Sequence, residues 1–219
     1  MYKKKLWKNM TNFQKRIFTS LIALPLSIFF VIKGGYLLAS FLIIILFTGA
    51  YELFSIFKKT KTILFLFIIL VLSLFSIYYL REKNPLLLYF AITITIGSDI
   101  GGYVFGKIFK GRKFSKISPK KTISGVFGSY FVSIAFFIFF FKFYFNYFPK
   151  LENSLISILW VIIASTVAQA GDLTISYFKR LEKIKDAGII LPGHGGIFDR
   201  IDGLIFVVIL TFFVQKVFL

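Results

Sequence analysis

Seven long apolar runs recur along the chain and constrain its fold more than any other feature. They cover residues 17–32, 36–57, 63–80, 85–106, 125–147, 153–178 and 202–219. Most of them approach the ~20 residues that an α-helix needs to cross a hydrocarbon core. Backbone groups in lipid must form their hydrogen bonds within the protein, and the alternating pattern of barrel strands is absent. The sequence therefore predicts an all-α polytopic integral membrane protein with about seven transmembrane helices.

Basic residues indicate how these helices are oriented. Cytoplasmic loops of membrane proteins are rich in Lys and Arg, whereas exported loops are poor in them. With a cytoplasmic N-terminus and seven alternating spans, 21 of the 27 basic residues fall on the cytoplasmic side and 6 fall outside. We therefore expect the N-terminus in the cytoplasm. No internal repeat and no linker rich in Pro, Gly or Ser is evident, which favours a single transmembrane domain over residues 1–219.

The formal net charge of +18 invites the interpretation that the chain binds nucleic acid. The bias of basic residues toward the cytoplasmic side accounts for most of this excess, and anionic lipid or nucleotide phosphate accounts for the rest. We therefore expect no nucleic-acid partner. The chain has no cysteine, which excludes a disulfide framework, a thiolate nucleophile and a thiolate metal site.

The fourth apolar run leads into a polar segment that carries the first candidate residues. Asp99 still lies within the run, where an ionisable side chain is costly and therefore indicates function. Four glycines thin the same predicted helix, either to admit a ligand or to let another helix pack closely. They are Gly97, Gly101, Gly102 and Gly106.

A basic turn, Ser-Pro-Lys-Lys-Thr, follows at residues 118–122, just before the next predicted helix. Ser118 and Thr122 supply hydroxyls, and Lys120 and Lys121 supply mobile positive charges. A helix N-terminus adds unpaired N–H groups and a positive dipole. The turn therefore suits a phosphate ligand, although basic turns at a membrane edge are common.

The sixth apolar run carries a row of polar side chains on one helical face. The row has helical spacing, at positions i, i+4, i+7 and i+8. Its members are Asp172, Ser176, Lys179 and Arg180. The face thus presents a carboxylate, a hydroxyl and then two cations toward the predicted cytoplasmic end. Several carboxylates at such a place are best neutralised together by a divalent cation.

Two further carboxylates at the start of the last predicted helix complete a predicted metal site. Asp199 and Asp202 are three residues apart, so that they share a helical face and can join Asp172 around one ion. We expect Mg²⁺, because hard cations take oxygen ligands and the chain has no cysteine and a single histidine. The alternative is a salt-bridge cluster without a metal, made of Asp172, Asp199, Arg180 and Arg200.

Between these two regions lies a glycine-rich turn, Pro-Gly-His-Gly-Gly, at residues 192–196. Its glycines permit unusual backbone angles and a close approach to a ligand. Its histidine can donate or accept a proton near neutral pH. Upstream in the same loop, a lysine and an aspartate offer a phosphate contact and a hydrogen bond that orients it. The substrate-binding candidates of this loop are Lys185, Asp186, His194, Gly195 and Gly196.

Residues 176–202, SYFKRLEKIKDAGIILPGHGGIFDRID, resemble in full the signature of the CDP-diglyceride synthetases, also called phosphatidate cytidylyltransferases. The segment from Ser98 and Asp99 to Gly106 and the turn at residues 118–122 are similar to the same family. The similar motifs therefore cover about residues 98–203. One departure is the serine at position 124, where the family usually has an acidic residue, and its effect on the enzyme is open.

The resemblance implies transfer of CMP from CTP to phosphatidic acid, which gives CDP-diacylglycerol and pyrophosphate in phospholipid biosynthesis. It implies a multi-pass protein of the plasma membrane whose active site faces the cytoplasm. The N-terminal helices are then expected at about residues 17–80 and the catalytic part at about 85–219. A homodimer and a second cation beside Mg²⁺ stay open.

The resemblance also implies roles for the candidate residues. Asp172, Asp199 and Asp202 are expected to hold Mg²⁺ and to be catalytic together with Lys179 and Arg180. The lone histidine is expected to contact a substrate rather than to act as a base, because a phosphate monoester is already ionised near neutral pH. The expected phosphate ligands are Lys120, Lys121 and Thr122 for CTP, and Lys179, Arg180 and Arg200 for the lipid phosphate or the pyrophosphate. Asp99 and Asp186 are second choices as residues of the site.

Two other functions remain as alternatives. A membrane transporter also uses intramembrane carboxylates, but it predicts charges near mid-membrane in repeated halves. The nearer alternative is another CTP-dependent lipid enzyme, such as a polyprenol kinase or a CDP-archaeol synthase.

Overall fold

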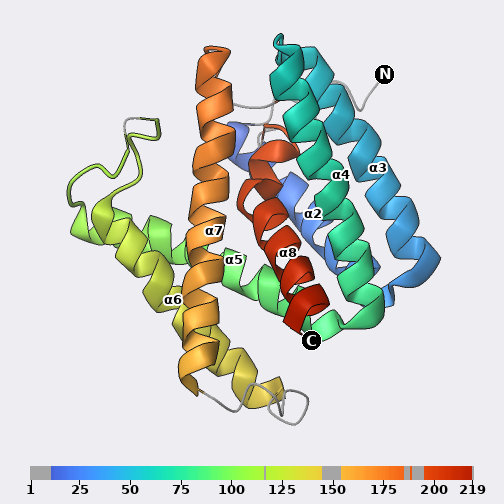
Figure 1. The fold of residues 1–219 in the computed structure, drawn as a ribbon. Coiled ribbons are helices and arrows are strands. Elements are labelled where there is room, and N and C mark those ends of the chain that lie inside the picture. The colour runs from blue at the N-terminus through green and yellow to red at the C-terminus, as the bar shows by residue number, and fades with distance from the viewer. Residues whose placement is uncertain (1–10, 116, 145–153, 185–187, 189–194, 219) are drawn as a thin grey trace. The chain divides into compact units, whose positions relative to one another are not determined.

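The computed structural model describes residues 11–115, 117–144, 154–184, 188 and 195–218. Within these residues the chain forms seven α-helices and no β-strand, which confirms the all-α prediction (Figure 1). The helices are α2 (Asn12–Lys33), α3 (Gly35–Ile56), α4 (Thr60–Lys83), α5 (Pro85–Phe109), α6 (Ile123–Tyr144), α7 (Ser154–Leu181) and α8 (Phe198–Phe218).

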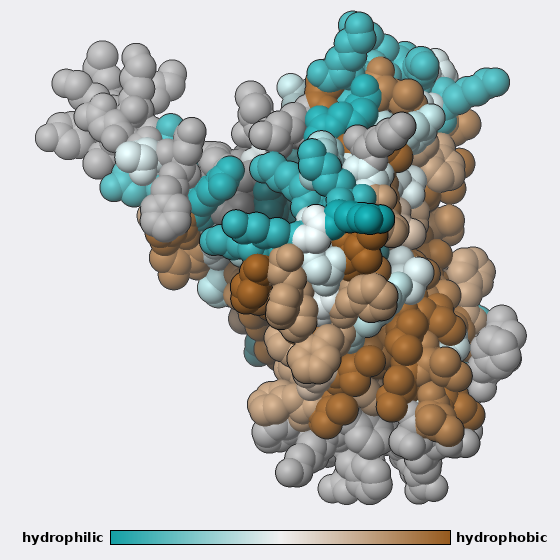
Figure 2. Space-filling model, turned by 90° about the vertical axis from the view of Figure 1, so that its left-hand side faces the viewer, coloured by the Kyte–Doolittle hydropathy of each residue, from teal (hydrophilic) through white to brown (hydrophobic). Residues whose placement is uncertain are grey.

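Six of these helices, α2 to α7, are long and apolar enough to cross a membrane. The apolar part of α8 is shorter, because its first turns carry Asp199, Arg200 and Asp202. Large hydrophobic side chains such as Phe47 and Leu155 are exposed, and Figure 2 shows a broad hydrophobic surface on the face that it draws. Such a surface is typical of helices that face lipid, and the chain is a multi-pass membrane protein. The cytoplasmic location of its N-terminus stays a prediction.

The chain folds into two compact units. The first contains Met1–Glu82 and Lys179–Ile201, and the second contains Lys83–Phe178 and Asp202–Leu219. Helices α2, α3 and α4 belong to the first unit, α5 and α6 belong to the second, and α7 and α8 contribute to both. The expected division into N-terminal helices and a catalytic part, like the expectation of a single domain, stays a prediction.

Polar side chains near the end of α4 fasten the turn between α2 and α3. The guanidinium group of Arg81 donates hydrogen bonds to the backbone carbonyls of Val31 and Ile32, the last turn of α2. The neighbouring carboxylate of Glu82 accepts a hydrogen bond of 2.8 Å from the backbone N–H of Gly35, where α3 begins. These contacts satisfy backbone groups that two helix ends leave unpaired.

In the second unit, α5 and α6 cross at a very short distance. A Cβ atom at Gly101 would lie 2.2 Å from the carbonyl oxygen of Gly128, and one at Gly128 would lie 2.3 Å from Cβ of Phe105. The hydroxyl of Ser129 on α6 also donates to the carbonyl of Ser98 on α5 at 2.7 Å. The glycines of α5 thus serve helix packing, which is one of the two roles that their spacing indicates.

Candidate active site

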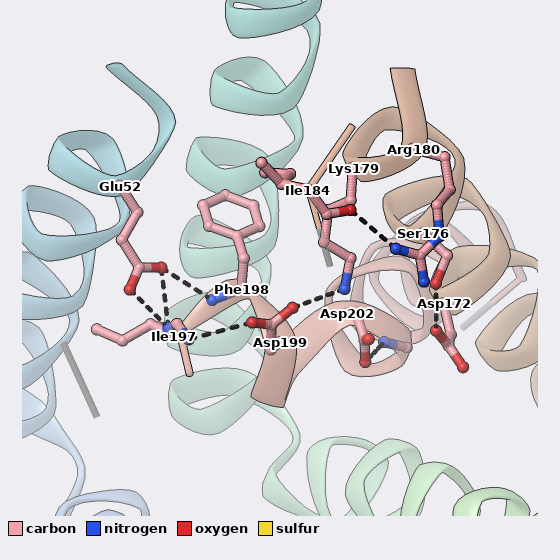
Figure 3. Close-up of polar contacts among 12 residues, drawn as sticks. Glu52, Asp172, Ser176, Lys179, Arg180, Ile184, Ile197, Phe198, Asp199 and Asp202 are labelled. Atoms are coloured by element: carbon pink, nitrogen blue, oxygen red, sulfur yellow. Dashed lines mark hydrogen bonds and ion pairs between the residues drawn. The ribbon is translucent and has the colours of Figure 1, made fainter. Parts of the chain in front are cut away.

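In the second unit, a lysine of the basic turn reaches an aspartate of α7. The Nζ atom of Lys121 lies 2.6 Å from Oδ2 of Asp172, and it also donates to the backbone carbonyl of Gln169 at 3.3 Å. The other carboxylate oxygen of Asp172 accepts a hydrogen bond of 3.2 Å from Ser176, one turn further along the helix (Figure 3). The side chains of Lys121 and Asp172 are 24% and 29% exposed, so that a ligand from solvent can reach both.

Asp99 on α5 lies in the electrostatic field of this ion pair. Its carboxylate is repelled by that of Asp172 and attracted by the ammonium of Lys121. Two carboxylates therefore share one positive charge, an arrangement that favours the binding of a further cation. The structure brings together residues from three separate segments that the sequence marks as candidates.

The basic turn is built on the N-terminus of α6. The backbone N–H of Lys121 donates to the carbonyl of Ser118 at 3.0 Å, which closes the turn. The hydroxyl of Thr122 accepts from the backbone N–H of Gly125 at 3.1 Å and lies 3.0 Å from the hydroxyl of Ser124. This is the pattern of a helix N-cap. Ser124, at the position where relatives are expected to carry an acidic residue, thus belongs to the cap of α6.

In the first unit, the last turn of α7 and the first turn of α8 form a second ion pair. The Nζ atom of Lys179 lies 2.6 Å from Oδ1 of Asp199, and their side chains are only 9% and 8% exposed. The other oxygen of Asp199 accepts a hydrogen bond of 3.1 Å from the backbone N–H of Gly196. Lys179 and Asp199 are therefore held firmly, because a buried ion pair of this kind strongly resists the loss of either partner.

A carboxylate that the sequence analysis did not single out lies beside this pair. Glu52 on α3 is 2% exposed, and its oxygens accept hydrogen bonds from the backbone N–H groups of Ile197 and Phe198. Its negative charge also interacts with that of Asp199. The signal was present in the sequence, because Glu52 is an ionisable residue within an apolar run, where such residues indicate function.

The other described candidates make local contacts or are exposed on the surface. Arg180 is exposed and donates to the carbonyl of Ile184 at 2.8 Å, and Lys120 and Arg200 are also exposed. Asp202 accepts a hydrogen bond of 2.9 Å from the backbone N–H of Gly203. In the glycine-rich turn, Gly195 has a φ of +89°, a backbone conformation that favours glycine. Three candidates lie outside the described residues, namely Lys185, Asp186 and His194.

The described residues do not form the complete metal site that the sequence predicts. Among the described residues, no group of three or more Asp, Glu or His side chains lies close enough to hold a metal ion. The oxygen atoms of Asp172, Asp99 and Ser176 in the second unit are nevertheless the type of donor that Mg²⁺ prefers. Binding of Mg²⁺ by Asp172, Asp199 and Asp202 therefore stays a prediction. The ion pairs of the described residues join Lys121 to Asp172 and Lys179 to Asp199, and the salt-bridge cluster stays an alternative.

The chain is similar to known proteins over most of its length. Residues 60–218 match the model of a family described as the Cytidylyltransferase family. A phosphatidate cytidylyltransferase of Rickettsia felis is 34% identical over 226 residues, which cover 97% of this chain and 96% of the relative. One from Rickettsia conorii is 32% identical over 97% of this chain and 94% of its own length. One from Staphylococcus epidermidis is 39% identical over 132 residues, or 59% of this chain and 49% of the relative.

Proposed function

Because the chain belongs to the cytidylyltransferase family, we propose that it transfers CMP from CTP to phosphatidic acid and releases pyrophosphate. The observation that carries this proposal is the similarity, over nearly the full length of both chains, to relatives named phosphatidate cytidylyltransferase. The product is CDP-diacylglycerol, an intermediate of phospholipid biosynthesis. The partners are accordingly CTP, phosphatidic acid and the lipid bilayer.

The chemistry requires no covalent nucleophile from the protein. A phosphate oxygen of phosphatidic acid attacks the α-phosphorus of CTP, and a new P–O–P linkage forms between lipid and nucleotide. The bond between the α- and β-phosphates breaks, and pyrophosphate leaves with the bonding electrons. Catalysis then consists of positioning the two substrates and of stabilising the charge on their phosphates.

Cationic side chains of the motifs supply this stabilisation in our proposal. Lys120 and Lys121 bind the CTP phosphates at the N-terminus of α6, where Thr122 completes the turn and the helix dipole favours negative charge. Lys121 is paired with Asp172 at 2.6 Å, and the proposal requires it to turn toward the nucleotide when CTP is bound. The lipid phosphate or the pyrophosphate is received by Lys179, Arg180 and Arg200.

Mg²⁺ is the proposed cofactor, held by Asp172, Asp199 and Asp202. When bound, the ion would neutralise the phosphate oxygens of CTP and make its α-phosphorus more electrophilic. The support is the chemistry of the donors, since carboxylate oxygens are the ligands that Mg²⁺ takes in proteins. Asp99 stands beside Asp172 as a second choice, and a second cation stays open.

We place this reaction at the cytoplasmic face of the plasma membrane, where CTP is available. The support is the excess of basic residues in the loops that carry the motifs.

The position of a radioactive label tests the proposed function against its alternatives. Purified chain in lipid vesicles is given phosphatidic acid and CTP labelled in the cytidine ring or at the γ-phosphate. Cytidine label in the lipid fraction is expected. Transfer of γ-phosphate alone would indicate a kinase, and transfer of neither label would leave a transporter. Archaeol-based and acyl-based lipid acceptors, compared side by side, separate a CDP-archaeol synthase from the proposed activity.

A further inference from the structure

We propose that Glu52 is a positioning residue, which fixes the start of α8 and thereby holds Asp199 in place for the reaction. This inference rests on the proposed function only in so far as Asp199 belongs to the active site. Glu52 lies outside residues 60–218, the part of the chain that matches the family.

The hydrogen bonds of Glu52 identify the backbone that it holds. The N–H of Ile197 lies 2.9 Å from one carboxylate oxygen and 2.8 Å from the other. The N–H of Phe198 lies 3.3 Å from the second oxygen. The first N–H groups of a helix have no partner within that helix, so that a carboxylate from another element can take the place of an N-cap. The positive end of the α8 dipole further favours a negative charge there.

Glycines on two sides of Glu52 show how closely this contact is fitted. One turn earlier on α3, a Cβ atom at Gly49 would lie 3.4 Å from the ring of Phe198, which is 1% exposed. Gly49 therefore lies next to the first residue of α8. At Gly188, a Cβ atom would lie 2.6 Å from Oε1 of Glu52 and 3.0 Å from its Cδ. The carboxylate thus lies against Gly188 as well as being bonded to Ile197 and Phe198.

The path from Glu52 to Asp199 is short. Gly196 donates its N–H to Asp199, and the next two N–H groups, of Ile197 and Phe198, bind Glu52. Two carboxylates thus divide three successive N–H groups at the start of α8, and Lys179 holds Asp199 from the other side (Figure 3). If Glu52 releases the backbone, the turn that carries Asp199 loses two of these three fixed points.

A buried carboxylate in an apolar helix costs free energy unless its bonds compensate. Glutamine would keep one oxygen for the N–H of Ile197 and would turn an N–H₂ group toward the other donor. Alanine would remove both acceptors. We therefore expect a graded series in which Glu52→Ala is more severe than Glu52→Gln.

The test combines amide hydrogen exchange with kinetics on the full chain in lipid vesicles. In Glu52→Ala, the amides of Ile197 and Phe198 should exchange at least about tenfold faster than in the unchanged chain. The kcat for CMP transfer should fall on the order of 10- to 100-fold, as for other residues that orient a ligand, while the KM for CTP changes much less. Gly188→Ala, which leaves Glu52 itself intact, should displace the carboxylate and change exchange and kcat in the same direction.

Glu82 is the matched control, because its carboxylate also accepts a backbone N–H, that of Gly35. Glu82→Ala and Glu82→Gln should leave both the exchange at residues 197 and 198 and the kcat unchanged. Unchanged exchange at these residues in Glu52→Gln and Gly188→Ala would overturn the proposal that Glu52 fixes the start of α8. Faster exchange with a normal kcat would show that the contact of Glu52 with α8 does not position Asp199 for the reaction. If the unchanged chain transfers no CMP, the proposed function fails, while the exchange data still decide whether Glu52 holds α8.

Discussion

The ammonium group of Lys121 lies 2.6 Å from the carboxylate of Asp172. This ion pair joins the basic turn before α6 to the polar face of α7, two motifs that lie far apart in the sequence. Both side chains are partly exposed, so that the pair is accessible to a phosphate and to a metal ion. Substitution of Lys121 or of Asp172 therefore tests whether each side chain takes part in the reaction.

Lys121 and Lys120 are adjacent in the basic turn but differ in their surroundings. Lys121 bonds to Asp172 and to the carbonyl of Gln169, whereas Lys120 is exposed. Since Lys121 interacts with Asp172 in addition to its proposed contact with CTP, Lys121→Met should lower kcat on the order of 100-fold and Lys120→Met by much less. Steady-state kinetics with CTP check this difference. Equal losses in both variants would contradict the assigned role of Lys121.

Asp172→Asn removes the charge of a predicted metal ligand without changing the size of the side chain. We expect kcat to fall on the order of 100-fold and the Mg²⁺ concentration for half-maximal rate to rise. Membrane insertion and helix content should stay unchanged, since Asp172 is only partly buried. A magnesium titration of the transfer rate measures both effects. A near-normal rate at low Mg²⁺ would show that Asp172 does not bind the cofactor.

Lys179 and Asp199 form a pair that is more than nine-tenths buried, so that stability and activity should respond differently. Lys179→Met alone leaves a buried carboxylate without its cation and should cost about 3 kcal/mol of unfolding free energy. Combining it with Asp199→Asn should recover much of that stability, while CMP transfer stays lost. Unfolding in detergent and rate measurements on both single variants and the double variant check this. A double variant as unstable as the sum of the single variants would contradict direct pairing.

Two glycines of α5 predict different costs of an added methyl group. At Gly101 the new Cβ would lie 2.2 Å from a backbone oxygen of α6, whereas at Gly106 the nearest atom is the hydroxyl of Thr122 at 3.0 Å. Backbone cannot move aside as a side chain does, so Gly101→Ala should cost about 1–3 kcal/mol and Gly106→Ala less. Thermal unfolding in detergent compares them. Equal unfolding temperatures would argue against the close crossing of α5 and α6.

The helices themselves could be predicted from the sequence, because the length of an apolar run is set by the thickness of the membrane. Each predicted run corresponds to one described helix, and α5 begins at Pro85 as expected. The main differences are at helix ends, because polar contacts determine the residue at which a helix begins or ends. Helix α8 begins at Phe198, four residues before its apolar run, since Glu52 and Asp199 bind the backbone N–H groups before and at its first residue.

The candidate site could be predicted only in part. Sequence motifs identified Lys121, Asp172, Lys179 and Asp199, and the described structure pairs all four. Which cation binds which carboxylate depends on the packing of helices, which no local pattern encodes. Glu52 was missed because it lies alone in an apolar run, far along the chain from the start of α8 that it binds. Its intramembrane charge was the one signal that could have found it.

The most direct test of the central claim is product analysis with the purified chain in lipid vesicles. With CTP, phosphatidic acid and Mg²⁺ supplied, mass spectrometry should detect CDP-diacylglycerol, and pyrophosphate should appear in equal amount. Asp172→Asn vesicles, prepared in parallel, should form little of either product. Consumption of CTP without CDP-diacylglycerol, or equal product formation by the Asp172→Asn variant, would contradict the account.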